Sequence, residues 1–347
     1  MTLSRKQFLG TLGGVAACMA APRAFSQSPI TLRLHHPLPP QAPIPRHALT
    51  KWADKVKKDS DGRIRVQLFP AMQLGGRPQD LVDQARNGVV DLVWTILGYT
   101  PGRFPKTEVF ELPFMVGKAT ESAVALQQYV EQQAMDEFKG VKLIAVHTHG
   151  PGLFHGRNPI KRLEDMQGMK VRGGSRIINI ALKELGAVAV GMPVPQTSEA
   201  LSKGVIDATT LPWEVVPAYR VQQTVKNHTG FAGAKGLYTQ TFGVMMNQKR
   251  YETLPDDLKA VIDANSGVEV ARAFGAVMDE YDQIGLKAAE KARNNIIMLD
   301  DKETARWQAA LLPTRDAWFK EVQGKGIDGP KLLAEAERLI EAQRSGS

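Results

Sequence analysis

Residues 87–91 read NGVVD and residues 203–207 read KGVID, and this repeated pattern decides the fold. In each copy a helical pattern ends at a glycine, the residue that most readily closes a helix, and a short apolar strand pattern follows. A recurrent helix-to-strand turn would also produce these letters. We favour the other explanation, that the chain contains two similar α/β lobes.

The first half of the chain alternates between strand and helix patterns. Residues 31–34 predict a strand, residues 49–56 a helix, and residues 63–68 a cleanly alternating strand. Residues 79–87 predict a further helix and residues 89–94 a buried strand. This order favours an α/β layer with parallel strands.

The second half repeats the theme. A short apolar strand ends at Met192, residues 197–203 predict a helix, and a strand begins at Val205. Residues 142–146 predict a strand that leaves the first lobe, and residues 236–246 predict one that returns to it.

The chain becomes strongly helical from Pro255 onward. Residues 268–293, 305–323 and 330–344 all carry helical patterns. Long helices that follow two lobes can brace both of them. The predicted fold class is therefore α/β, with two lobes and long C-terminal bracing helices.

The composition excludes several classes of protein. The 347 residues are 43% hydrophobic and 23% charged, which is typical of a globular chain and not of a disordered one. A single cysteine excludes an internal disulfide framework and a four-cysteine zinc site. The net charge of +8 falls to +5 without the N-terminal leader, and the remaining cations are dispersed. We therefore expect no nucleic-acid partner.

Residues 1–26 are typical of a secretory signal peptide. Arg5 and Lys6 precede an apolar run over residues 8–21, which is too short to span a bilayer. Small residues at Ala24 and Ser26 offer a cleavage site. We expect the mature protein to be soluble and periplasmic.

Two other interpretations of this leader remain open. The segment around Arg5 is similar to a twin-arginine export motif in which lysine replaces the second arginine. Residues 15–18 are similar to a lipoprotein box, which would make Cys18 a lipid anchor. We favour ordinary cleavage, because the small-residue site lies downstream and would remove Cys18.

Motifs for catalysis and cofactor binding are missing from the sequence. It contains no G-x-S-x-G, H-E-x-x-H, G-x-x-x-x-G-K-[ST] or G-x-G-x-x-G motif. The seven histidines lack acids or cysteines at metal-ligand spacing. We expect no metal, no cofactor and no enzymatic activity.

Residues 159–172 read PIKRLEDMQGMKVR and resemble a signature segment of DctP-type solute-binding proteins, which serve TRAP importers of organic acids. Shorter stretches of this sequence also match the family in order, over about residues 30–230. They are residues 62–64, 69–75, 88–91, 112–114 and 199–207.

The resemblance implies a two-lobed periplasmic binding protein that closes like a hinge on its ligand. It implies that the protein delivers a small carboxylate ligand to the membrane subunits of a TRAP transporter, and we expect a monomer. Lobe I would comprise residues 27–149 and 238–277, and lobe II residues 150–237 and 278–345. ABC-type and tripartite-tricarboxylate-type receptors share this architecture. A periplasmic enzyme acting on an organic acid and a sensory receptor are further alternatives.

Arg172, the last residue of the signature segment, corresponds to the family arginine that binds the ligand carboxylate. A guanidinium presents a planar fork that can bond both carboxylate oxygens and stays charged. We expect this side chain to be reserved for the ligand and to support little else in the protein.

Two departures from the family pattern concern the ligand. Leu211 replaces the family's ligand-contacting asparagine, and Trp213 follows closely, which suggests a more apolar pocket if Trp213 is not simply a core residue. Pro151 or a neighbour occupies the place of a second family arginine. We therefore expect a monocarboxylate with an apolar or aromatic body.

Four more residues are candidates for the binding site. Trp94 and Tyr99 follow a predicted strand. They should form part of the wall of the binding site, which we expect between the lobes and near the carboxyl ends of strands. His36 and His149 could donate hydrogen bonds to a 2-hydroxy or 2-keto oxygen of the acid.

Overall fold

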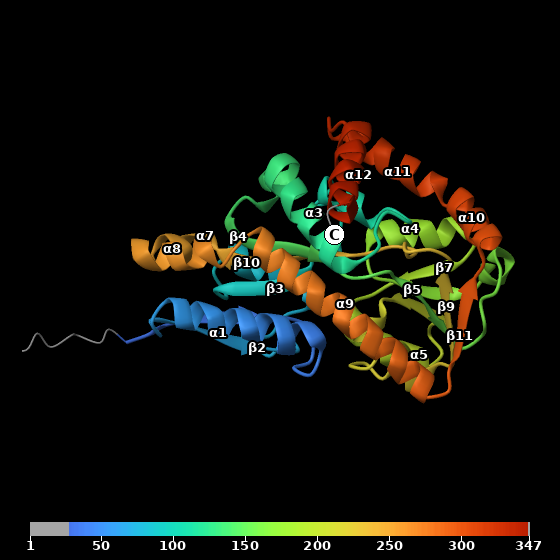
Figure 1. The fold of residues 1–347 in the computed structure, drawn as a ribbon, viewed down its shortest axis with the longest axis horizontal. Helices are drawn as coiled ribbons and strands as arrows, with labels where there is room; N and C mark the ends of the chain where they lie inside the picture. The colour runs from blue at the N-terminus through green and yellow to red at the C-terminus, as the bar shows by residue number, and fades with distance from the viewer. Residues whose placement is uncertain (1–27, 346–347) are drawn as a thin grey trace, which may run out of the picture.

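The computed structural model describes residues 28–345, so every prediction about the leader lies outside the described residues. Two β-sheets divide these residues into two lobes (Figure 1). Sheet A has the order β2-β1-β3-β10-β4, and we call the part built on it lobe I. Its strands are β1 (Ile30–His35), β2 (Ile64–Phe69), β3 (Leu92–Ile96), β4 (Val141–Thr148) and β10 (Thr241–Asn247).

Sheet B has the order β11-β9-β5-β8-β6-β7, and we call the part built on it lobe II. Its strands are β5 (Leu153–Gly156), β6 (Lys170–Gly173), β7 (Val188–Gly191), β8 (Ala208–Leu211), β9 (Asn227–Phe231) and β11 (Asn295–Leu299). Both sheets are mixed. Strand β1 is parallel to β2 and β3, whereas β10 is antiparallel to β3 and β4.

The repeated sequence pattern folds in the same way in both lobes. The amide of Val89 donates to Gln84 O at 2.9 Å, and the amide of Val205 donates to Ala200 O at 2.9 Å. Both valines are exposed, at 55% and 52%, and the strands begin only after the aspartate that follows. The predictions that strands begin at residues 89 and 205 were therefore early, because this valine belongs to the turn.

Helices cover both sheets (Figure 1). In chain order they are α1 (Thr50–Asp59), α2 (Leu81–Arg86), α3 (Ala119–Tyr129), α4 (Arg176–Glu184), α5 (Thr197–Ser202), α6 (Val221–Thr224), α7 (Gln248–Glu252), α8 (Asp256–Ala264), α9 (Val268–Lys291), α10 (Asp301–Ala310), α11 (Leu312–Gly324) and α12 (Gly329–Ser345). Helix α12 packs on α3 of lobe I and α11 packs on α4 of lobe II, so the C-terminal helices brace both lobes as predicted.

The long helix α9 runs diagonally across both lobes (Figure 1). Two glycines permit the close approach. A Cβ atom on Gly275 would lie 2.6 Å from Ala119 O in lobe I, and one on Gly285 would lie 2.0 Å from Trp213 O in lobe II. One continuous helix is thereby in backbone contact with both lobes.

The predicted division into residues 27–149 with 238–277 and residues 150–237 with 278–345 stays a prediction. The chain passes from sheet A to sheet B between β4 and β5, and back between β9 and β10. The third predicted boundary falls inside α9.

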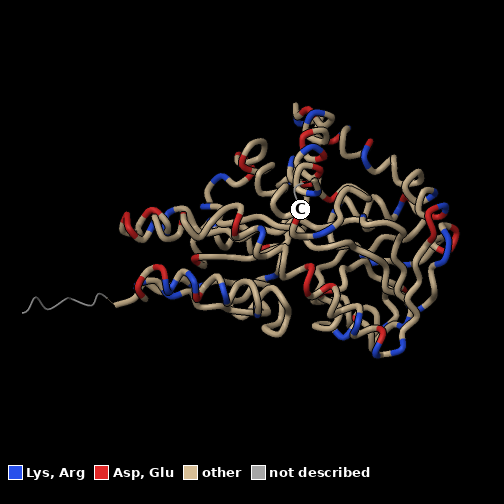
Figure 2. The backbone as a smooth tube through the Cα atoms, in the orientation of Figure 1, with Lys and Arg blue, Asp and Glu red and all other residues tan. Residues whose placement is uncertain are grey.

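Charged residues of both signs alternate along the outer helices (Figure 2). Within residues 28–345, no helix combines the length and apolar character needed to cross a membrane.

Candidate functional site

A narrow cavity of about 20 Å³ lies between the two lobes, near the carboxyl ends of parallel strands. Leu38 follows β1, Trp94 and Ile96 belong to β3, and Leu211 ends β8. The full lining is Leu38, Trp94, Ile96, His149, Gln240 and Phe242 from lobe I, with Val194, Leu211, Pro212, Glu214 and Val215 from lobe II. Ligands of open α/β sheets bind at this edge.

Aromatic rings form one wall of this cavity. Trp94 and Phe242 stack with ring centroids 5.3 Å apart and planes 13° from parallel. The indole Nε1 of Trp94 donates to His147 Nε2 at 2.9 Å, which satisfies its one polar group. Burial lowers the pKa of His147 to about 3, so this acceptor nitrogen stays unprotonated. The wall presents flat apolar surface to whatever occupies the cavity.

Arg172 on β6 is fully buried and held by two backbone carbonyls. Its Nε donates to Met192 O at 2.9 Å and its Nη1 to Thr210 O at 3.1 Å. Its Nη2 makes no hydrogen bond of standard geometry. The prediction that Arg172 supports little else was therefore wrong, because the guanidinium also joins β6 to its neighbours. The guanidinium is therefore fixed in place, and its Nη2 remains available to a ligand.

Gln240 offers a second unpartnered donor beside Arg172. Its Nε2 is buried without a hydrogen bond. A Cβ atom on Gly174 would lie 2.6 Å from Gln240 Nε2 and 2.8 Å from Arg172 Nη2, so the two nitrogens face one small region. Arg172 does not itself line the cavity, but Gln240 does. The sequence analysis missed Gln240, which lies inside the predicted returning strand of residues 236–246 and carries no motif that marks it.

Tyr99 connects the lobes at the same place. Its hydroxyl accepts a hydrogen bond from the amide of Val194 in lobe II at 2.9 Å. Burial raises the pKa of this phenol, and the neighbouring Arg172 guanidinium partly opposes the shift. Tyr99 therefore lies next to the candidate anchor, but it does not line the cavity, so its predicted place in the wall of the site stays a prediction.

His149 lines the cavity, but both of its ring nitrogens are engaged. Nδ1 lies 2.6 Å from Gly150 O, and Nε2 accepts from the amide of Gln240 at 3.0 Å. Burial, opposed by the Gly150 hydrogen bond and assisted by the Arg172 cation, lowers the pKa of His149 to about 3. The predicted role as a ligand donor does not hold here; the ring instead positions Gln240.

His36 is buried beside the aromatic wall. Its ring stands edge-on to Trp94, with centroids 6.5 Å apart. Neither ring nitrogen makes a hydrogen bond of standard geometry, and burial lowers the pKa of His36 to about 4. His36 does not line the cavity directly, so its predicted role as a ligand donor stays a prediction.

Leu211 and Trp213 have different positions. Leu211 lines the cavity. The Trp213 ring does not; it lies against His155 and His228, with centroids 5.1 and 5.0 Å away. His155 Nε2 donates to Leu211 O at 3.1 Å, so the Nδ1 of a neutral His155 accepts a hydrogen bond from His228 Nδ1 at 2.7 Å. Trp213 thus covers a histidine pair that holds the Leu211 backbone.

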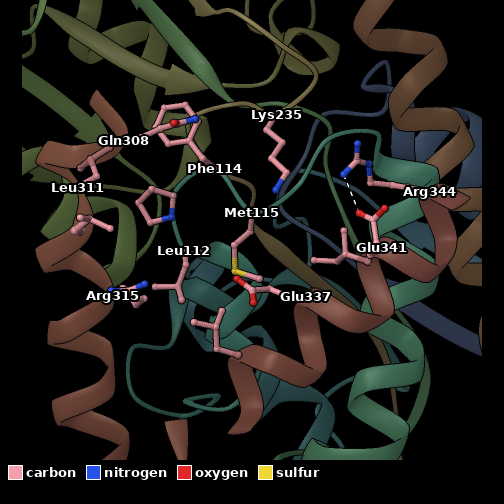
Figure 3. A pocket seen from close by; sticks show the side chains of 14 residues that line it. Leu112, Phe114, Met115, Lys235, Gln308, Leu311, Arg315, Glu337, Glu341 and Arg344 are labelled. Atoms are coloured by element: carbon pink, nitrogen blue, oxygen red, sulfur yellow. Dashed lines mark hydrogen bonds and ion pairs between the residues drawn. The ribbon is translucent and has the colours of Figure 1, made fainter. Parts of the chain in front are cut away.

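A second hollow of about 450 Å³ lies away from these residues, between α12, the α10–α11 junction and residues 112–115 (Figure 3). Cations and acids share its rim. Arg344 pairs with Glu341 at 2.9 Å on one side of the hollow, and Arg315 lies on the opposite side, with Lys235 and Glu337 also in the lining. This mixed rim offers no preference for an anion, so the interlobe cavity remains the candidate site. Within residues 28–345 no group of three or more His, Cys, Asp or Glu is arranged to hold a metal ion.

Comparison with known proteins agrees with this geometry. The profile of the family described as "Bacterial extracellular solute-binding protein, family 7" (DctP) matches residues 34–321. A TRAP solute-binding protein from Rhodoferax ferrireducens, solved with copurified benzoate, is 42% identical, with a TM-score of 0.89 over 91% of this chain and 99% of that one.

Two further solved structures are similar over the same extent. A TRAP solute-binding protein from a marine metagenome, specific for aromatic acids and crystallised with 3-hydroxybenzoate, is 42% identical, with a TM-score of 0.89 over 91% of this chain and 99% of that one. A TRAP periplasmic solute-binding protein from Bordetella bronchiseptica with bound (R)- and (S)-mandelate is 30% identical, with a TM-score of 0.84 over 90% of this chain and 99% of that one.

The family match identifies the chain as a solute receptor rather than an enzyme. The chain belongs to family 7 of the bacterial extracellular solute-binding proteins, the DctP family. It is a solute-binding protein of the TRAP type, with the two-lobed fold of its relatives, and not an ABC-type or tripartite-tricarboxylate-type receptor.

Proposed function

We propose that this protein binds an aromatic monocarboxylate in the interlobe cavity, with Arg172 and Gln240 holding the carboxylate. The pair of unpartnered donors, Arg172 Nη2 and Gln240 Nε2, carries this proposal. A buried carboxylate without donors is strongly unfavourable, and a charged guanidinium is the donor that stabilises it most. The stacked rings of Trp94 and Phe242 suit a planar body.

The chemistry of the cavity limits the number of carboxylates. The lining that the described residues form contains no Arg or Lys, Arg172 lies beside it, and Leu211 contributes only apolar surface. A second carboxylate would be buried without a cation. The benzoate, 3-hydroxybenzoate and mandelate found in the three relatives are all aromatic acids with one carboxylate, which supports the same class here.

The receptor would act with the membrane subunits of a TRAP transporter. We infer that ligand closes the two lobes and that the closed surface is what the membrane subunits bind. Size-exclusion chromatography with light scattering should give a monomer with and without ligand. A stable dimer would contradict the proposed oligomeric state.

Calorimetry on the purified protein tests the ligand class. Benzoate, 3-hydroxybenzoate and mandelate should bind at least tenfold more tightly than succinate or malate, because only the dicarboxylates must bury a second charge. A thermal-shift screen gives an independent readout, since a ligand at about 100 times its Kd stabilises the folded state by roughly 2.7 kcal/mol. A preference for C4-dicarboxylates would overturn the proposal.

Export to the periplasm has its own test. Mass spectrometry of the protein recovered from the periplasm should give an N-terminus near Gln27. An intact Met1 would contradict export by a cleaved leader. Lipid on Cys18 would show membrane anchoring instead.

A further inference from the structure

Glu214 is a buried acid in the wall of the interlobe cavity that the proposed carboxylate anchor does not use. It belongs to the short helix η9 (Trp213–Val215), which follows β8. The residue is 5% exposed, lines the cavity, and its Oε2 makes no hydrogen bond. Among the residues that line the cavity, it supplies the one carboxyl group.

The position of Glu214 is fixed through its backbone. Its amide donates to Asp282 Oδ1 on α9 at 2.7 Å. Asp282 is itself 7% exposed, and a Cβ atom on Gly150 would lie 2.0 Å from its Oδ2, so this contact is tightly packed. Helix α9 thereby holds η9 in place, and the Glu214 side chain is free to serve another partner.

The surroundings of Glu214 favour its neutral form. None of the ion pairs recorded within residues 28–345 includes Glu214 or Asp282. Burial, together with the neighbouring Asp282 carboxyl, raises the pKa of Glu214 well above its usual range. A protonated carboxyl has one O–H donor and remaining acceptor capacity, so it can pair with a hydroxyl group in either direction.

We propose that Glu214 is a specificity-determining residue that hydrogen-bonds a hydroxyl substituent on the body of the bound acid. The favoured ligands are then hydroxylated aromatic monocarboxylates rather than the unsubstituted acid. This inference rests on the proposed function. Its physical basis is that an unpartnered buried polar group is unfavourable, and a hydroxyl group on the ligand supplies the missing partner.

His149 and His36 are the two other groups predicted to recognise a hydroxyl group, and the structure places each of them less well than Glu214. His149 has no ring nitrogen left for a ligand. His36 has no hydrogen bond of standard geometry and packs edge-on against Trp94, but it does not line the cavity. Glu214 is therefore the better placed of the two that remain, and a His36 variant makes a useful comparison.

The experiment measures a ratio of affinities. Calorimetry at pH 7 compares benzoate with the 2-, 3- and 4-hydroxybenzoates for wild type, Glu214→Gln, Glu214→Met and His36→Phe, with the exposed Glu199→Gln as a matched control. Wild type should bind its best hydroxybenzoate about 2- to 12-fold more tightly than benzoate, the range that one net hydrogen bond gives. Glu214→Gln should keep this preference, because an amide also donates and accepts, and Glu214→Met should lose it.

A purely structural role for Glu214 would lower both affinities together and leave their ratio unchanged. The inference is overturned if the preference survives in Glu214→Met, if it is absent in wild type, or if His36→Phe removes it and Glu214→Met does not. If wild type binds none of these aromatic acids, the proposed function fails and this inference falls with it. Glu214→Ala, which removes the carboxyl group without adding bulk, covers the case in which Glu214→Met does not fold, because it should lose the preference in the same way.

Discussion

Asp91 in lobe I and Asp207 in lobe II make the same contact. Oδ2 of Asp91 accepts a hydrogen bond from the backbone amide of Arg33, and Oδ2 of Asp207 accepts one from the backbone amide of Lys170, each at 2.8 Å. Each aspartate immediately precedes a strand and ties its start to the neighbouring parallel strand. The two lobes thus share this side-chain-to-backbone hydrogen bond as well as the helix-to-strand turn.

Alanine at either aspartate should destabilise the protein. A hydrogen bond to a charged group contributes about 1.5–3 kcal/mol, so each variant should lose about that much free energy of unfolding in urea. Asp91→Ala should lose more than Asp207→Ala, because Asp91 also pairs with Arg33 and Arg250. The excess should be small, since those arginines are well exposed. The reverse order would contradict the assignment.

Arg172→Ala should weaken ligand binding more than any other change in the site. Removing one partner of a buried charge pair costs about 2–5 kcal/mol, or roughly a 30-fold to several-thousand-fold loss of affinity. Arg172→Lys should restore only part of it, because an ammonium lacks the planar fork. Urea unfolding of Arg172→Ala without ligand should also show a loss, since the carbonyls of Met192 and Thr210 lose their donor. Alanine affinity within about threefold of wild type would remove Arg172 from the site.

Gly174→Ala should weaken binding without unfolding the protein. The added methyl group would enter the space between Gln240 Nε2 and Arg172 Nη2, at 2.6 and 2.8 Å, and would separate the two donors. We expect at least a tenfold loss of affinity for benzoate in calorimetry. Gly324→Ala is the matched control, because a Cβ atom there meets nothing within 4 Å. Equal affinities of the two variants would show that the carboxylate does not bind beside Gly174.

His147 should make stability depend on pH. Burial lowers its pKa to about 3 from an ordinary value of 6.5, so between these values the unfolded chain binds one proton more than the folded protein. The contribution of neutral His147 to the free energy of unfolding is complete above pH 6.5 and is lost as the pH falls toward 3. One proton changes the free energy of unfolding by about 1.4 kcal/mol per pH unit. Urea unfolding between pH 5.5 and 4 gives the slope of the free energy of unfolding against pH. This slope should be smaller in His147→Gln than in wild type by that amount, and an unchanged slope would contradict a neutral His147.

Local signals made much of the fold predictable. The helix at residues 81–86 and the glycine after it follow from periodicity and turn chemistry, and so do β1 and β2. The strands of lobe II were harder. Strands β5 and β6 have four residues each, and β6 contains the charged Arg172, so neither carries a clear apolar alternation.

The site depended on contacts that a linear pattern does not encode. Arg172 was found because it ends a family signature, whereas its bonds to Met192 and Thr210 arise only when β7 and β8 flank β6. Gln240 and Glu214 come from segments far apart in the chain, and nothing in their neighbours marks them as cavity residues. For His149 the sequence analysis predicted a ligand donor that the structure does not offer. The residue lines the cavity, but both of its ring nitrogens already make hydrogen bonds within the protein.

Strand β10 lies between β3 and β4 in sheet A, yet it is made after all of lobe II up to β9. A chain that stops before residue 241 therefore leaves a gap in the middle of the N-terminal sheet, with unpaired backbone groups on both sides. Lobe I cannot finish folding while the chain is still being synthesised up to that point. An N-terminal fragment would be a poor free-standing domain, and a nascent chain awaiting export would remain open until late in its synthesis.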